Sequence, residues 1–254
     1  MRKRLSILLL IIGLAAVTSY SKGIAATDNI KLSTIQTNKL NIKQSAEAEK
    51  EELINEGDSY SNSKNTSKPG ILLVNRNNRL EEDYVPQSLR VPNVRFISYA
   101  DSRVKKIDTS AASALETLFD AAREDGVTLL AVSGYRDYFY QEKLYNNKVS
   151  AVGQKEADKY VAQPGASEHQ TGLAMDVLSD EYSSLDEGFE QTQAYRWIKN
   201  NCHKYGFIIR YPKGKENITG YNYECWHLRY VGISEATEIS QKNITLEEYL
   251  NKVE

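Results

Sequence analysis

Cysteine and histidine are scarce in this chain. Only two cysteines, Cys202 and Cys225, occur among its 254 residues, which is too few to build a disulfide-stabilised scaffold. Their positions do not decide whether the two thiols pair. The chain has three histidines, His169, His203 and His227, and two of them lie in segments dense with polar residues. Any chemistry that uses imidazole must therefore come from these few positions.

A surplus of positive charge is also absent. The formal net charge is −2, and residues 1–25 contribute four basic residues and no acidic one, so removing those four charges takes the net charge from −2 to −6. Proteins that bind nucleic acids usually carry a basic surface. The composition therefore predicts no nucleic-acid partner.

The apolar segment near the start of the chain is too short for a typical membrane-spanning helix. Residues 5–17 are almost wholly apolar and follow Arg2, Lys3 and Arg4, whereas a spanning helix needs roughly 20 apolar residues. Small residues come next, which is typical of a cleaved export signal, although an uncleaved anchor remains an alternative. We therefore expect residues 1–25 to be a signal peptide or membrane anchor. The protein would then act outside the cytoplasm, secreted or held at the outer face of the membrane through this segment alone.

The composition changes twice along the rest of the chain. Residues 26–68 are rich in Lys, Glu, Asn, Ser and Thr without sustained periodicity, which predicts a flexible tether. The turn signal Pro69-Gly70 ends it, and residues 69–254 are expected to form one domain. Apolar or β-rich segments predict strands at 71–74, 128–132, 173–177, 207–210 and 226–230. Helices are expected from 109 or 110 to 125 and at 138–147, 155–162, 191–205 and 245–250. Because these elements do not alternate regularly, we expect an α+β fold with a small central antiparallel sheet and flanking helices.

Two of the histidines and one aspartate form a candidate metal site. His169, Asp176 and His227 offer two imidazoles and one carboxylate, and three protein ligands with a fourth position open are typical of a catalytic zinc. Asp176 would lie on a strand and His169 in the loop before it, with Gly172 allowing a close turn between them. The pattern therefore predicts one Zn²⁺ per chain.

Glu224 is the candidate general base of this site. A zinc-bound water has a pKa of about 7 and still needs a group to take its proton when it attacks a carbonyl. Strand alternation would place Glu224 on the face opposite His227. Glu224 must therefore lie in a loop or bulge just before the strand. The third histidine, His203, lies on a helical stretch beside charged residues and is expected to be exposed.

Three motifs together resemble a known family. They are Ser133-Gly134-Tyr135-Arg136, then Ser167-x-His169-x-x-Gly172-x-Ala174-x-Asp176, and Glu224-x-Trp226-His227. This set is similar to the VanY-type D-alanyl-D-alanine carboxypeptidases, part of the group that includes lysostaphin-like peptidases and the hedgehog amino-terminal domain. The resemblance covers roughly residues 70–252 and implies the fold of that group, with residues 69–254 as a zinc carboxypeptidase domain.

The resemblance also implies roles for individual residues. It implies that His169, Asp176 and His227 are the zinc ligands and that Glu224 is the catalytic base. It also implies that Arg136 stabilises the transition-state oxyanion or holds the substrate. Three further residues match positions that line the substrate site in relatives, namely Gln141, Ser167 and Tyr211. Each of them could instead be structural. The implied activity is removal of the terminal D-Ala from peptidoglycan stem pentapeptides, which also suggests a role in glycopeptide resistance. We expect the protein to act as a monomer.

The sequence leaves several alternatives open. Close relatives with similar motifs act as L,D-carboxypeptidases on tetrapeptide stems, and hedgehog-type relatives illustrate a zinc-bearing binding module without catalysis. The joint presence of Glu224 and Arg136 favours an enzyme over such a module. No wall-binding repeat or second domain is visible, which weighs against a wall endopeptidase. Cys225 stands where relatives commonly have proline, so its thiol is either a passive replacement or a competing zinc ligand.

Overall fold

The computed structural model describes residues 70–251. The predicted export segment 1–25 and tether 26–68 lie outside these residues, so both remain predictions. None of the helices within 70–251 combines the length and the apolar character needed to cross a membrane.

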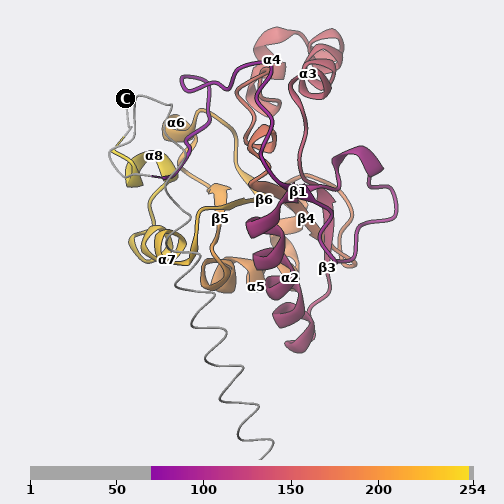
Figure 1. Cartoon of the computed structure of the whole chain (residues 1–254), viewed down its shortest axis with the longest axis vertical. Coiled ribbons are helices and arrows are strands. Elements are labelled where there is room, and N and C mark those ends of the chain that lie inside the picture. Colours follow the sequence, from indigo (N-terminus) through magenta and orange to yellow (C-terminus); the bar gives the residue numbers. More distant parts are fainter. Residues whose placement is uncertain (1–69, 252–254) are drawn as a thin grey trace, which may run out of the picture. The chain divides into compact units, whose positions relative to one another are not determined.

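A four-stranded antiparallel sheet forms the centre of the domain (Figure 1). Its strand order is β3-β4-β6-β5, with bounds β3 (Leu129–Ser133), β4 (Ala174–Ser179), β5 (Phe207–Tyr211) and β6 (Glu224–Tyr230). Each of the four coincides with a predicted strand to within three residues. The sheet with its flanking helices confirms the predicted α+β fold.

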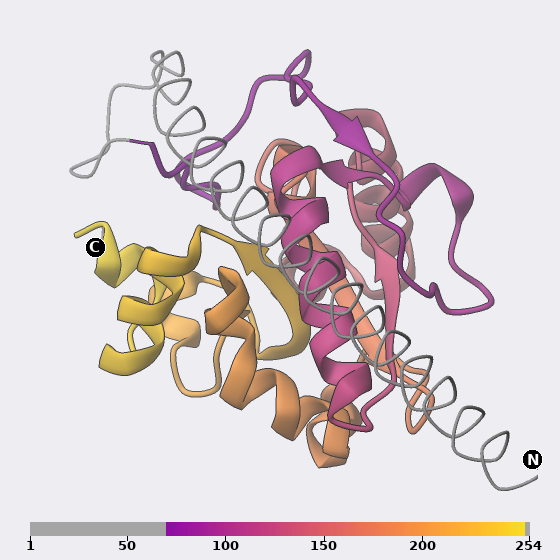
Figure 2. The same ribbon diagram turned by 60° about the horizontal axis from the view of Figure 1, so that its bottom comes forward.

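The main hydrophobic core lies between this sheet and two helices, α2 (Thr109–Glu124) and α5 (Gln193–Asn201). Figures 1 and 2 show α2 lying along the sheet. The predicted apolar face of α2 is buried as expected, with Leu115 and Leu118 fully enclosed. Its N-cap is Asp108, whose carboxylate accepts a hydrogen bond from the Ser110 amide, one residue before the expected capping position.

The remaining helices lie at the ends and edge of the sheet. α3 and α4 pack against each other away from the main core (Figure 1). The predicted helix 191–205 is divided, because α5 ends at Asn201 and a 3₁₀ segment continues to Tyr205. The helices and 3₁₀ segments not yet given are α3 (Tyr138–Val152), α4 (Gln154–Tyr160), α6 (Glu216–Thr219), α7 (Ile233–Lys242), α8 (Leu246–Tyr249), η1 (Ser102–Val104), η2 (Glu168–Thr171), η3 (Glu187–Gln191) and η4 (Cys202–Tyr205).

Several elements differ from the sequence expectation. The prediction of a strand at 71–74 is wrong. The Leu72 carbonyl oxygen accepts a hydrogen bond from the Arg229 side chain at 2.6 Å and takes no part in strand pairing. Leu73 packs with α7 and α8 in a second, smaller core. Helix α7 and the two-residue strands β1 (Leu89–Arg90) and β2 (Ile107–Asp108) were not predicted.

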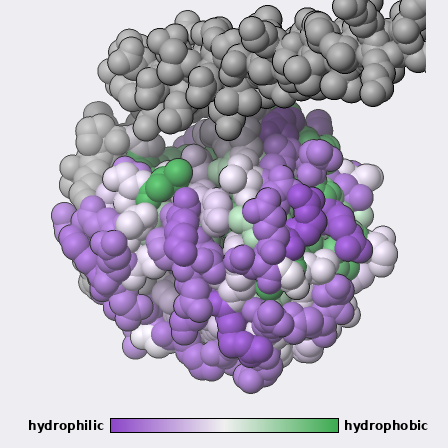
Figure 3. Space-filling view, turned by 90° about the horizontal axis from the view of Figure 1, so that it is seen from below, coloured by the Kyte–Doolittle hydropathy of each residue, from purple (hydrophilic) through white to green (hydrophobic). Residues whose placement is uncertain are grey.

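The surface seen in Figure 3 is mostly hydrophilic, and its hydrophobic side chains are gathered in small patches. This distribution is ordinary for a surface in contact with water.

Candidate active site

Two predicted ligands lie opposite each other on neighbouring strands. Asp176 of β4 pairs in register with His227 of β6, and the adjacent pair is Met175 with Leu228. Successive side chains on a strand point to opposite faces. Since Met175 and Leu228 belong to the main core, Asp176 and His227 project from the other face of the sheet.

The third predicted ligand, His169, lies on η2 just before β4. The chain turns from η2 into β4 at Gly172, which has a left-handed backbone with φ of +71°. A Cβ atom at this position would lie 2.9 Å from Leu89 Cδ2. Glycine is therefore favoured here by both its backbone and its surroundings, as the sequence predicted.

The three side chains converge on one point. Asp176 Oδ1 lies 3.4 Å from His169 Nε2 and 3.2 Å from His227 Nδ1, and the three candidate ligand atoms are all within 4.8 Å of one another. Each side chain is at most 6% exposed. Asp176 Oδ1 is buried and makes no hydrogen bond within residues 70–251. A buried anionic oxygen without a hydrogen bond is costly, and a divalent cation held by these atoms would remove that cost.

The environment of His169 leaves one ring nitrogen free to act as a ligand. Its Nδ1 lies 2.7 Å from the Gly134 carbonyl oxygen, which can only accept, so Nδ1 carries the proton and Nε2 keeps its lone pair. Burial, together with the charge of Arg136, lowers the pKa of His169 to about 4. The imidazole is therefore neutral at physiological pH, as metal binding requires.

His227 has the opposite shift. Burial disfavours its charged form, but contacts with the carboxylates of Asp176 and Glu168 outweigh burial and raise its pKa to about 9. In the metal-free protein His227 is therefore protonated at neutral pH. A metal ion that binds at Nδ1 must displace a proton.

Glu224 reaches the same face as His227 through an irregularity in β6. Ile209 pairs with Leu228 and Tyr211 pairs with Glu224, so two steps along β5 correspond to four along β6. This bulge breaks the alternation, and Glu224 Oε2 lies within 3.6 Å of His227 Nδ1. The expected bulge is therefore present, but it lies within β6, whose first residue is Glu224, and not before the strand. Burial raises the pKa of Glu224 to about 7.

Arg136 adjoins this group and is fixed by two side chains. Its Nη1 donates to Ser133 Oγ at 2.9 Å and its Nε donates to Gln141 Oε1 at 3.0 Å. Nη1 also lies 3.6 Å from Asp176 Oδ2. A cavity of about 370 Å³, lined in part by Arg136, Tyr135 and Tyr140, opens beside it. We call His169, Asp176 and His227, together with Glu224 and Arg136, the ligand cluster. Within this cluster, Arg136 is the residue that lines the cavity.

The three other predicted substrate residues lie at or near this cluster. Gln141 is 1% exposed, and its amide nitrogen donates to the Ala162 carbonyl, so its described contacts are with the protein. The Tyr211 ring lies 4.9 Å from the His227 ring. Ser167 is buried two residues before His169. Their predicted contact with substrate remains a prediction.

Cys225 and His203 lie outside the cluster. The Cys225 thiol is buried in the main core, where it contacts the Asp186 carbonyl at 3.6 Å, and burial raises its pKa to about 12. These contacts favour a passive role over zinc coordination. Cys202 and Cys225 are both free thiols. His203 is partly buried on η4 and not exposed as expected, because η4 packs beneath α7.

Sequence reasoning missed two residues that contact the predicted ones. Ser133 holds Arg136, and Glu168 Oε2 lies 3.5 Å from His227 Nε2. Both residues stand inside the quoted motifs, next to or near the residues that drew attention. A second carboxylate or hydroxyl beside a ligand is the signal that could have found them.

A family model described as VanY, D-alanyl-D-alanine carboxypeptidase, matches residues 104–233, just over half of the chain. The protein YodJ of Bacillus subtilis, which carries the provisional name of a carboxypeptidase, is 48% identical over 72% of this chain. A D-alanyl-D-alanine carboxypeptidase of Enterococcus faecalis is 40% identical over 71% of this chain. The matched regions span 67% and 65% of the lengths of these two relatives.

Solved structures are similar over the same part of the chain. The LD-carboxypeptidase LdcB aligns with a TM-score of 0.68 and 49% identity, covering 72% of this chain and 86% of LdcB. A variant of the vancomycin-resistance D,D-pentapeptidase VanY, in complex with Zn(II), aligns with a TM-score of 0.59 and 39% identity, covering 71% and 98% of the two chains. VanYB in complex with D-alanine-D-alanine aligns with a TM-score of 0.59 and 40% identity, covering 71% and 96%.

Proposed function

The chain belongs to the VanY family of D-alanyl-D-alanine carboxypeptidases, and from this premise we propose that it is a zinc-dependent enzyme that removes the C-terminal D-alanine from peptidoglycan stem peptides. The observation that carries the proposal is the convergence of His169, Asp176 and His227 around Asp176 Oδ1, a buried oxygen that forms no hydrogen bond with the described part of the chain. Glu224 and Arg136 lie beside this point, where a base and a cation are needed. A binding module without catalysis has no use for either.

Zinc would be held by His169 Nε2, Asp176 Oδ1 and His227 Nδ1. When bound, it supplies a Lewis acid that lowers the pKa of a water molecule to about 7. Glu224 would accept the proton of the attacking water and pass it to the departing amine. In the metal-free protein, burial raises the pKa of the Glu224 carboxyl to about 7, and general acid–base catalysis works best with a group whose pKa lies near the operating pH.

Arg136 supplies positive charge on the substrate side of the cluster. Its guanidinium is 15% exposed, and its contacts with Ser133 and Gln141 fix its orientation before substrate arrives. A planar donor fork can stabilise either the oxyanion of the transition state or the terminal carboxylate of the peptide. Binding a free carboxylate would make the enzyme an exopeptidase.

Two observations point to substrates of different length. The family description and the complex of VanYB with D-alanine-D-alanine support cleavage of the D-Ala–D-Ala bond of pentapeptide stems. The higher identity to the LD-carboxypeptidase LdcB supports a second candidate, removal of D-Ala from tetrapeptide stems. Only the first activity would destroy the terminus that glycopeptide antibiotics bind and so contribute to resistance.

The substrate also bears on where the enzyme works. Peptidoglycan lies outside the cytoplasmic membrane, which agrees with the export segment expected at residues 1–25. We therefore propose an extracytoplasmic enzyme, and fractionation of cells that express the full chain tests this. Recovery of the protein only from the cytoplasm would contradict it.

Incubation of the purified protein with pentapeptide and tetrapeptide stems, with and without a chelator, tests the activity. We expect chelator-sensitive loss of one D-Ala, measured by mass, with the pentapeptide stopping at tetrapeptide for D,D activity. Conversion of tetrapeptide to tripeptide with untouched pentapeptide would establish the L,D candidate. If neither peptide is shortened by zinc-loaded protein, the proposed function is wrong.

A further inference from the structure

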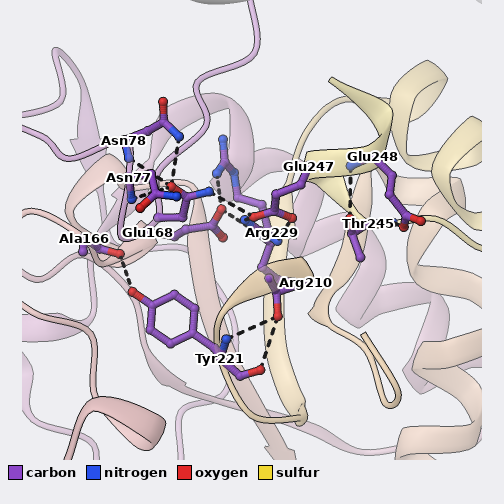
Figure 4. A network of polar contacts seen from close by, with 12 residues as sticks. Asn77, Asn78, Ala166, Glu168, Arg210, Tyr221, Arg229, Thr245, Glu247 and Glu248 are labelled. Carbon is purple, nitrogen blue, oxygen red and sulfur yellow. Dashed lines mark hydrogen bonds and ion pairs between the residues drawn. The ribbon is translucent and has the colours of Figure 1, made fainter. Parts of the chain in front are cut away.

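Four buried charged side chains form an ion network next to His227. They are Glu168 of η2, Arg210 of β5, Arg229 of β6 and Glu247 of α8, and Figure 4 shows them converging. Their side chains are at most 1% exposed. Two carboxylates face two guanidinium groups, so the ion network is balanced in charge.

Hydrogen bonds hold Glu168 in place. Its Oε1 accepts from Arg210 Nε at 2.7 Å and from Arg229 Nη1 at 2.6 Å. Arg210 Nη1 and Nη2 donate to the two oxygens of Glu247 at 2.8 and 2.5 Å. Arg229 Nη2 donates to the Leu72 carbonyl at 2.6 Å. The other oxygen of the first carboxylate, Glu168 Oε2, takes part in none of these contacts.

Glu168 Oε2 faces the ring nitrogen of His227 that points away from the proposed zinc site. It lies 3.5 Å from His227 Nε2. Both atoms are buried and neither has a hydrogen-bond partner within residues 70–251. If Nδ1 is the zinc ligand, Nε2 of the neutral ring carries the proton. A buried donor and a buried acceptor therefore face each other, each lacking another partner.

We propose that Glu168 is a positioning residue that accepts the Nε2–H of His227 and so keeps Nδ1 directed at the zinc. The inference rests on the proposed function, because it requires His227 to be a zinc ligand. Histidine ligands commonly donate their second nitrogen to a carboxylate, which fixes the tautomer and the ring orientation. The arginines hold the carboxylate in the orientation that this contact needs.

The ion network also connects the zinc site to both ends of the domain. Leu72 and Asn75 precede the residues 104–233 that match the family model, and α8 follows them. Asn75 Nδ2 donates to Glu247 Oε1 at 3.3 Å. Segments outside the matched region therefore contribute to the ion network that contains Glu168.

The variant Glu168→Gln tests this role, with Glu247→Gln as its matched control. In glutamine the amide oxygen stays with the arginines, so the NH₂ group would face the Nε2–H of His227 and place donor against donor. We expect the zinc Kd, measured by chelator competition, to rise about 10- to 100-fold, the usual loss for such partners. Glu247→Gln removes the same charge without touching His227, and its Kd should stay within about 3-fold of wild type. Equal Kd changes in the two variants would overturn the proposal.

A charge-balanced variant separates the loss of the Glu168–His227 contact from the loss of the Glu168 charge. Glu168→Gln combined with Arg229→Gln removes one charge of each sign, and the weakened zinc binding should persist. Recovery of the wild-type Kd would show that Glu168 serves only charge balance. A wild-type protein that binds no zinc would instead contradict the proposed function.

The wild-type protein offers a readout that does not depend on how the variants fold. Long-range proton–nitrogen NMR spectra of the zinc-loaded enzyme report which ring nitrogen of His227 is protonated. We expect a proton on Nε2 that exchanges slowly with solvent. A proton on Nδ1 would overturn the proposal.

Discussion

The ligand cluster and the ion network meet at His227, and both bury charged side chains, yet they differ in how completely those charges are paired. In the ion network, two carboxylates are matched by two guanidinium groups through hydrogen bonds of 2.5 to 2.8 Å. In the ligand cluster, the two carboxylates face Arg136 and the protonated ring of His227 across longer contacts of 3.2 to 3.6 Å, and Asp176 Oδ1 makes no hydrogen bond within residues 70–251. The ion network therefore supports the fold, whereas the ligand cluster is left open to a ligand.

The same contrast is seen in the pKa values of the two glutamates. Burial alone would raise both pKa values. At Glu168, the charges of Arg210 and Arg229 overcome burial and hold the pKa far below its usual range. At Glu224, burial prevails and raises the pKa to about 7. Glu168 is therefore a permanent acceptor, and Glu224 can exchange a proton near neutral pH.

The largest expected effect is on catalysis. Glu224→Gln should lower kcat by roughly two to four powers of ten, because the amide cannot accept the proton of the attacking water. Zinc content and folding should be preserved, because glutamine has nearly the same size and shape as glutamate and Glu224 is not one of the three proposed zinc ligands. Steady-state rates with the stem peptide that the wild type cleaves provide the measurement.

The exposed Glu187→Gln is the control for that variant and should keep its full rate. Glu187 has a side chain that is 68% exposed. A Glu224→Gln enzyme with near-normal kcat would assign the base to another group.

Disrupting the ion network should instead lower the free energy of unfolding. Arg210→Met leaves the buried carboxylates of Glu168 and Glu247 without their shared cation, and breaking a buried pair in this way costs about 3–5 kcal/mol of unfolding free energy. Lys213→Met breaks an exposed contact to Glu190 and should lower the unfolding free energy far less, because water and salt screen such a pair. Denaturant unfolding of both metal-free variants measures the difference. Equal losses would mean that the ion network contributes no more than a surface pair.

The ligand cluster should also bind zinc more tightly as the pH rises. His227 has a pKa of about 9 in the metal-free protein, so below that pH zinc must displace one proton, and the zinc Kd should fall about tenfold per pH unit. His169, with a pKa of about 4, releases no proton in this range. Chelator competition at pH 6, 7 and 8 gives the slope. A Kd that does not change with pH would show that His227 is already neutral.

The sequence predicted the ligand cluster because its residues stand in recognisable motifs. His169, Asp176, His227 and Glu224 were found from residue type and spacing within those motifs, and the need for a bulge near Glu224 followed from strand alternation. The ion network was not found, because Glu168, Arg210, Arg229 and Glu247 are common charged residues and the sequence does not show which of them pair. Pairing of distant charges depends on the packing of η2, β5, β6 and α8, which no local pattern encodes.

The errors in the predicted fold have a similar origin. Residues 71–74 have the composition of a strand, but the Leu72 carbonyl is bound by a side chain 157 residues away. Helix α7 was missed, although its buried residues Ala236 and Ile239 have helical spacing. The helix is otherwise polar, so the apolar stripe that these two residues form is recognised only from their packing in the second, smaller core.

Zinc content tests the central claim most directly. Elemental analysis of purified wild type, His227→Ala and His203→Ala compares a proposed ligand with the one histidine outside the ligand cluster. We predict one zinc per chain in the wild type and in His203→Ala, and none in His227→Ala. Equal zinc in the wild type and in His227→Ala would contradict the proposed site.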